Sequence, residues 1–354
     1  MAPTDKEMLG RLSFVRLRAR RGSILVVVLW ALFFLGALAV SIYALLAPQI
    51  GLAGRLRDRT RLYYLAQAGA QKAAAVLAGD ETEDADGFND VWANSEEEFK
   101  DMRLGEDGYV SVSYKFLDDD GAEETRYGLV DEAGKININT APSEVFKRFF
   151  ELTAQTTSQT AGDIADSILD WVDEDSDPRE GGAEDGYYEG LAQAYACKDA
   201  KFQILEELLL VKGMTQDIFD NVGAYLTVYG DGKVNLNTAG EYVLEALGMD
   251  GTLADKVIRH RRGNDGREAT SDDNIFESVE TVAASLSDGV GLSAEETGQL
   301  NTMIASGLAG VRSDYFSGES HAGLRYDDEE EARLTTNIFF VMDRGKNIRY
   351  WRER

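Results

Sequence analysis

The acidic segment at residues 170–188 holds the side chains of this sequence best suited to binding a metal ion. Its candidate ligands are carboxylates on both sides of a glycine pair at positions 181 and 182: Asp173, Asp175, Asp177, Glu184 and Asp185. The first three alternate along the chain, and the glycines permit a turn that returns the last two. Ca²⁺ takes roughly six to eight oxygen ligands, which alternating acidic side chains can supply. The segment therefore predicts a calcium site, with a solvated acidic loop as the alternative.

Other site chemistries find little support in the sequence. The acidic segment lacks EF-hand spacing, because the glycine and the final glutamate of that motif are misplaced. The two histidines, His260 and His321, lie in no His-Glu-x-x-His motif, and no serine or cysteine lies in a nucleophile elbow. The single cysteine, Cys197, permits no intrachain disulfide and is expected to be a small, semi-buried residue. We therefore expect no enzymatic activity.

The amino-terminal region predicts a membrane anchor that is processed at its start. An uncharged run from Ser23 to Ala47 follows Arg21 and Gly22, and at about 1.5 Å per residue it can cross a hydrocarbon layer roughly 30 Å thick. A secretory signal would have its cleavage site after the apolar core, whereas Gly22 precedes it. The junction resembles a type IV prepilin leader, which a prepilin peptidase cuts after the glycine. Residue Ser23 would then be the methylated amino terminus; a plain signal anchor is the alternative.

Charge predicts the orientation of this anchor. The first 22 residues carry six bases and two acids, and the remainder carries 30 bases and 61 acids, a net charge of −31. Basic residues beside a spanning helix mark the cytoplasmic side, so we expect a single-pass inner-membrane protein with its acidic part in the periplasm. A surface this negative repels nucleic acid.

The patterns predict an α+β fold. We expect a leader at 1–22, a long membrane and pilin helix at 23–78 (or two helices broken at Pro48), and a pilin-like head with a small antiparallel sheet at 79–134 and 313–354. Strand patterns occur at 109–117, 125–130, 334–342 and 347–351, and a short helix is expected near 96–102. Residues 135–312 are predicted to form a large helical insertion into the head.

This insertion contains an internal repeat, with units at about 135–210 and 233–285. The run Gly134-Lys-Ile-Asn-Ile-Asn-Thr-Ala matches Gly232-Lys-Val-Asn-Leu-Asn-Thr-Ala, and each Asn-Thr-Ala is expected to cap a following helix. The units resemble helix-hairpin-helix modules, which leaves a membrane-anchored DNA-uptake protein as the alternative function. We favour a protein-contacting role, because Asp250 lies in the second hairpin and the one basic cluster, 259–262, is surrounded by acids.

Together these motifs resemble the minor pseudopilin K family of type II secretion systems. The resemblance rests on Arg21-Gly-Ser with Val27 in place of the usual glutamate, Tyr64-Leu-Ala-Gln-Ala-Gly, residues 131–141, the acidic segment and residues 205–215. The last hundred residues match more loosely, and Gly318 to Glu331 looks like a variable acidic loop.

The resemblance implies a non-catalytic subunit at the tip of a periplasmic pseudopilus, beside minor pseudopilins I and J. There it would help start assembly and limit pilus length for export of folded proteins. It also implies calcium binding by the five carboxylates of the acidic segment, with Asp170 less favoured. Val27 would let the subunit sit at the top of the stack, since a pilin glutamate needs the amine of a neighbour within the apolar filament.

Overall fold

The computed structural model describes residues 23–80, 82, 84–117, 123–154, 156–325 and 334–353. The leader, with Gly22, lies outside these residues. The chain divides into two compact units, one ending at Thr60 and the other beginning at Arg61.

Helix α1 (Ser23–Leu77) is a single helix that contains Pro48, so the alternative of two helices broken there is wrong. Ser23, the predicted first residue of the mature chain, is the first residue that the structure describes. The large apolar side chains of α1 from Ile24 to Leu52 are exposed. The helix is long and apolar enough to cross a membrane, with a mean hydropathy of 2.7 in its most apolar window. The predicted long amino-terminal helix is confirmed.

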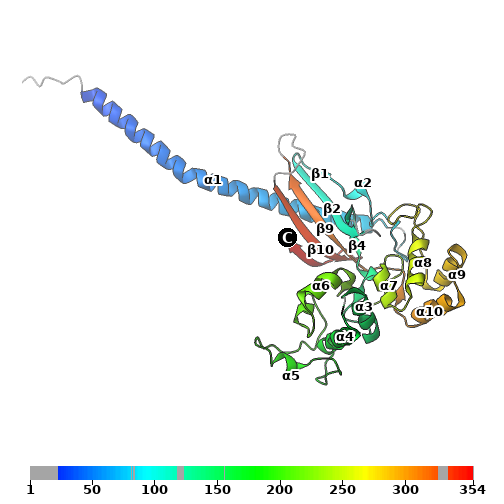
Figure 1. Cartoon of the computed structure of the whole chain (residues 1–354). Helices are drawn as coiled ribbons and strands as arrows, with labels where there is room; N and C mark the ends of the chain where they lie inside the picture. Colours follow the sequence, from blue (N-terminus) through cyan, green and yellow to red (C-terminus); the bar gives the residue numbers. More distant parts are fainter. Residues whose placement is uncertain are drawn as a thin grey trace, which may run out of the picture. The chain divides into compact units, whose positions relative to one another are not determined.

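The second unit contains an antiparallel sheet with the order β1-β2-β9-β10-β11, to which β3 and β4 add at β2 and β9 (Figure 1). Its strands are β1 (Met102–Leu104), β2 (Gly108–Leu117), β3 (Glu123–Arg126), β4 (Val130–Asp131), β9 (Tyr315–Leu324), β10 (Leu334–Asp343) and β11 (Ile348–Glu353). A short helix, α2 (Glu96–Phe99), precedes β1. Strands from both ends of the chain therefore form one sheet.

The last turns of α1 pack on one face of this sheet. Small residues such as Ala70 and Ala73 meet Val112, Phe316 and Phe340 in one apolar cluster. Gly69 is the point of closest approach, since a Cβ there would lie 2.2 Å from Ser320 Oγ and 2.9 Å from a Val110 methyl. The small-residue run in this part of the helix thus allows close contact between helix and sheet.

Helices fill the region between β4 and β9. They are α3 (Ser143–Thr153), α4 (Ser158–Val172), α5 (Asp185–Tyr188), α6 (Gln216–Val222), α7 (Glu241–Ala246), α8 (Gly251–Arg261), α9 (Val282–Gly289) and α10 (Ala294–Ala305), with 3₁₀ turns η1 (Glu132–Gly134), η2 (Leu205–Leu210), η3 (Gly223–Tyr225) and η4 (Val279–Thr281). A core of its own joins these helices, and Phe146, Phe149 and Phe150 of α3 are completely buried in it.

Two short parallel strand pairs close this helical region. β5 (Ile136–Asn137) pairs with β6 (Leu226–Thr227), and β7 (Val234–Asn235) pairs with β8 (Ala309–Gly310). The closing strands β6 and β8 lie beyond residues 210 and 285, where the two repeat units were predicted to end.

The repeated asparagines make corresponding hydrogen bonds in the two copies. Asn139 accepts from Phe202 N at 2.7 Å and donates to Phe202 O at 3.1 Å, and Asn237 makes the same pair with Phe276 at 2.7 and 3.1 Å. The helices that follow have Pro142 and Gly240 as N-caps, without a side-chain cap. The predicted Asn-Thr-Ala caps are therefore wrong, because these amides hold distant segments instead.

A second sequence expectation is also wrong. Gly318 to Leu324, predicted as the start of a variable acidic loop, belongs to β9, which lies between β2 and β10. Hydrogen bonding on both edges fixes this strand despite its polar residues. The rest of that predicted loop, residues 326–331, lies outside the described residues.

Candidate metal centre

The acidic segment begins at the carboxyl end of α4, where Asp170 holds it to the helix. The Asp170 carboxylate is completely buried and accepts hydrogen bonds from Ala183 N at 2.8 Å, Arg179 N at 3.2 Å and Arg179 Nη1 at 2.5 Å. Burial raises the pKa of Asp170, and the contacts with Arg179 oppose that rise. Asp170 therefore holds the acidic segment against α4.

The glycine pair makes the return turn that the sequence suggested. A Cβ on Gly182 would lie 1.8 Å from Asp170 Oδ2, so a side chain at this position would occupy the space of the carboxylate. Lys212 Nζ donates to the carbonyl oxygens of Gly181 and Gly182 at 3.0 and 2.9 Å. This ammonium thus holds both carbonyl groups of the turn.

The fold brings together three of the five predicted ligands. Asp173 caps the carboxyl end of α4 and Glu184 precedes α5, and carboxylate oxygens of Asp173, Asp175 and Glu184 lie within 4.8 Å of one another. We call these three residues the carboxylate cluster. Their oxygens are the hard donors that Ca²⁺ prefers.

The other two predicted ligands have different surroundings. Asp185 Oδ1 accepts a hydrogen bond from Cys197 N at 2.7 Å, which ties α5 to the segment before η2. Asp177 is exposed, and its amide donates to Asp175 Oδ1 at 2.9 Å. Neither residue belongs to the carboxylate cluster.

Buried oxygens without hydrogen-bond partners mark this region as suited to a cation. Among the described residues, the buried carboxylate oxygens that lack a partner are Asp173 Oδ1, Glu184 Oε1 and Asp199 Oδ1. Leaving such a group unsatisfied costs about 1–3 kcal/mol or more when it is charged. Burial raises the pKa of Glu184 to about 6, and the nearby Asp170, Asp199 and Asp173 add to the effect. A bound cation would neutralise this negative charge, so the residues fit a metal ion.

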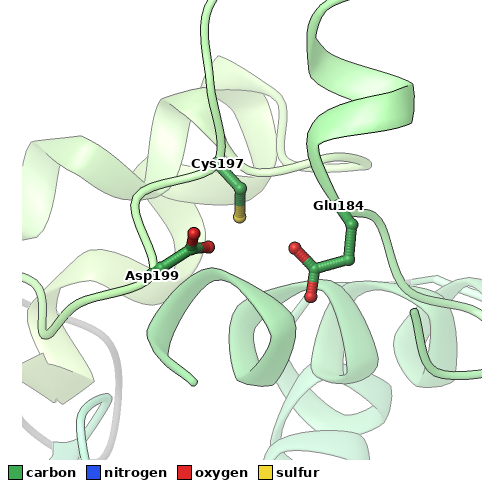
Figure 2. A group of neighbouring side chains, drawn as sticks. All are labelled: Glu184, Cys197 and Asp199. Carbon is green, nitrogen blue, oxygen red and sulfur yellow. The ribbon is translucent and has the colours of Figure 1, made fainter. Parts of the chain in front are cut away.

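Sequence reasoning missed two neighbours of Glu184. Figure 2 shows the side chains of Cys197 and Asp199 directed toward Glu184, and donor atoms of the three lie within 4.8 Å of one another. Asp199 lies 15 residues after Glu184 in an irregular segment, and it has a positive φ of 48°. No motif or periodicity in the sequence connected it with the acidic segment.

Two other groups of acidic residues have their charges compensated by the protein. Asp80 and Asp86 both pair with Arg344, and Asp86 also accepts from Ser313 N at 2.7 Å. Asp272 accepts hydrogen bonds from the amides of Asn264 and Asp265 at 2.8 and 3.1 Å.

The basic run at 259–262 does not form the exposed patch that DNA binding would need. Arg261 is buried, donates to Leu236 O and Ala239 O at 3.0 and 2.7 Å, and pairs with Glu268. Asp250, in the preceding hairpin, accepts from Leu253 N at the start of α8. A carboxylate thus occupies the helix terminus where a DNA phosphate would bind.

Comparisons with known proteins bear on the segment that contains this site. Residues 120–231 match the sequence model of the family described as type II secretion system (T2SS), protein K. The type II secretion system protein K of Pseudomonas aeruginosa is 29% identical over 238 residues. The chain is similar to members of this family in this part of its sequence.

That alignment covers 62% of this chain and 65% of the length of the Pseudomonas protein. A solved structure shares the fold of this chain. In the GspK-GspI-GspJ complex from the type 2 secretion system of enterotoxigenic Escherichia coli, one chain matches with a TM-score of 0.62 at 16% identity, covering 85% of this chain and 98% of that one. The α+β fold with its long amino-terminal helix is therefore confirmed.

Proposed function

We propose that this protein is a non-enzymatic minor pseudopilin of a type II secretion system. It would be anchored in the inner membrane by α1, with its head and helical region in the periplasm. The observation that supports the proposal is the combination, in one chain, of an exposed apolar amino-terminal helix with a fold that matches a chain of the GspK-GspI-GspJ complex. The solved relative forms a complex with GspI and GspJ, and we propose I- and J-type minor pseudopilins as partners here.

Processing at Gly22 is the first test of this proposal. The full chain, co-expressed with a prepilin peptidase, should yield a mature amino terminus at Ser23 carrying a methyl group, because the basic leader precedes the apolar helix on the cytoplasmic side. Amino-terminal sequencing and mass spectrometry measure both. A Gly22→Ala variant is the control and should keep its leader; an uncut wild-type chain would contradict the class.

We propose that the subunit sits at the tip of the pseudopilus and limits its length. Val27 brings no carboxylate that needs an amine above it, and the large helical region would obstruct a further subunit. Residues 135–312 can be deleted as a unit, because β4 and β9 pair at Val130 and Ser317. A Val27→Glu variant lacking this region should appear along the filament in immunogold microscopy, whereas exclusive tip labelling would refute the idea.

We propose Ca²⁺ as the ion of the carboxylate cluster. Asp173, Asp175 and Glu184 would supply oxygens, and the bound ion would offset the repulsion among them and link α4 to α5. The division of the chain into a pilin-like head and an inserted helical domain at 135–312 is likewise our proposal.

Calcium titration of the full mature chain in detergent tests the cluster. Asp175→Asn should weaken binding by about tenfold or more, since it removes a charged ligand without changing side-chain shape. Asp288→Asn, at an exposed aspartate on α9, is the matched control. Isothermal titration calorimetry measures both variants, and equal affinities in the two would remove the cluster as the site.

A further inference from the structure

Glu184, Cys197 and Asp199 form a second group of potential metal ligands beside the carboxylate cluster. Glu184 immediately precedes α5, and the other two lie in the irregular segment before η2. Figure 2 shows the thiol between the two carboxylates, and donor atoms of all three residues lie within 4.8 Å of one another. We call these residues the thiol site.

The carboxylates of the thiol site have donor capacity that the described protein does not use. Glu184 is only 6% exposed, and its Oε1 has no hydrogen-bond partner; Asp199 Oδ1 is also buried without one. The cysteine thiol has a single proton, and its sulfur lies 3.7 Å from Asp170 O. Two buried carboxylate oxygens thus remain next to one sulfur.

Sulfur distinguishes this position from the carboxylate cluster. Ca²⁺ is bound by oxygen ligands, whereas thiolates favour softer ions such as Zn²⁺, which also accepts carboxylate oxygens. Zn²⁺ binds sulfur at about 2.3 Å and oxygen at about 2.0–2.2 Å, so a small contraction of the three side chains would place them around one ion. A water molecule can complete a tetrahedral shell.

We propose that the thiol site binds a thiophilic divalent cation and that this cation is Zn²⁺ in the cell. On binding, the Cys197 S–H bond gives its proton to solvent and a sulfur–metal bond forms, while Glu184 and Asp199 each supply an oxygen. Glu184 belongs to both groups, so its carboxylate can connect an ion at the thiol site with one at the carboxylate cluster. The inference does not depend on the secretion role or on calcium.

The single cysteine makes a direct test possible. Cd²⁺ serves as a spectroscopic probe for Zn²⁺, and its bond to a thiolate gives an ultraviolet charge-transfer absorption. The full mature chain in detergent, reduced with a phosphine and kept in Ca²⁺, is titrated with Cd²⁺ and then with competing Zn²⁺. We expect a band that saturates at one Cd²⁺ per chain and that Zn²⁺ removes, since it can arise only from Cys197.

Variants separate the thiol site from the calcium proposal. Cys197→Ser and Cys197→Ala should both lose the band and keep calcium affinity, and Asp199→Asn should weaken Cd²⁺ binding by about tenfold or more. Asp175→Asn should lose calcium affinity and keep the band. The wild-type chain must itself show the charge-transfer band. The absence of the band from wild type therefore counts against the proposal whether or not the variants fold.

Absence of the band in saturating Cd²⁺, or Cd²⁺ affinity unchanged in both cysteine variants, would overturn the proposal. Calcium affinity that is unchanged in Asp175→Asn, with the band retained, would instead count against the calcium proposal alone.

Discussion

Asp170 and Glu184 are both buried carboxylates of the acidic segment, yet their surroundings give them different roles. Asp170 accepts hydrogen bonds from backbone amides and from Arg179, so its charge is compensated within the protein. Glu184 lacks a partner at Oε1 and has neighbours of like charge. Burial alone does not indicate a metal ligand, and the missing hydrogen-bond partner is what makes Glu184 a candidate.

Glu296 offers a prediction for pH dependence at the level of one residue. It pairs with Lys256 at 2.7 Å and forms a capping box with Ser293, and these contacts lower its pKa to about 2. A pKa lowered by folding means that Glu296 stabilises the protein above pH 4.5 and loses that effect as the pH falls toward 2.

Glu296→Gln should therefore be less stable than wild type at pH 7, with the difference shrinking between pH 4.5 and 2. Urea unfolding over this range, in the presence of a chelator, measures the effect. Glu295→Gln, at an exposed neighbour, is the control, and a pH-independent difference for Glu296→Gln would contradict the prediction.

At the scale of elements, the repeated asparagines hold segments that are far apart in the sequence. Asn237→Ala should destabilise the protein by about 2–4 kcal/mol, because it leaves both backbone groups of buried Phe276 without partners. Chemical denaturation measures the change. Asn301→Ala, at an exposed position of α10, should change stability by less than about 0.5 kcal/mol, and an equal loss in both variants would refute the assigned role.

The contact between α1 and β9 gives a second prediction at this scale. Gly69→Ala should destabilise by about 1–3 kcal/mol, because its new methyl group would overlap the Ser320 hydroxyl. Ser320→Ala should be neutral or stabilising, since that buried hydroxyl has no hydrogen-bond partner. The double variant should recover part of the loss in a denaturation double-mutant cycle; strict additivity would contradict the overlap.

Local patterns predicted the elements well, and long-range contacts explain what they missed. The strands β10 and β11 alternate and flank a short turn, so their hairpin is visible in the sequence. Asn139 accepts a hydrogen bond from a residue 63 positions further along the chain. Its position shortly before a helix had instead suggested that it caps that helix. Likewise, Asp199 joins Glu184 only through tertiary folding. Three of five predicted ligands converge because they flank one turn, which the glycine pair had indicated.

At the scale of the whole molecule, the negative charge of the chain leads us to expect that its stability depends on cations. The region after residue 22 carries a net charge of −31, and the carboxylate cluster concentrates part of that charge in a partly buried place. Free Ca²⁺ at a hundred times its Kd should raise the free energy of unfolding by about 2.7 kcal/mol, if only the folded chain binds it.

Thermal unfolding of the mature chain across a calcium series measures this rise. Asp173→Asn should flatten the dependence, while Asp288→Asn should follow wild type. A wild-type Tm that ignores calcium would contradict the prediction.

The short parallel pairs that close the helical region have a consequence for how such a protein evolves. Ile136 pairs with Leu226, and Val234 pairs with Ala309. Each of the two chain segments that these pairs enclose, which we call lobes, therefore begins and ends at neighbouring points. Duplication or deletion of the corresponding gene fragment can therefore add or remove one lobe while the flanking strands keep their positions. Such an exchange would change the surface of the helical region and leave the antiparallel sheet and the end of α1 as they are.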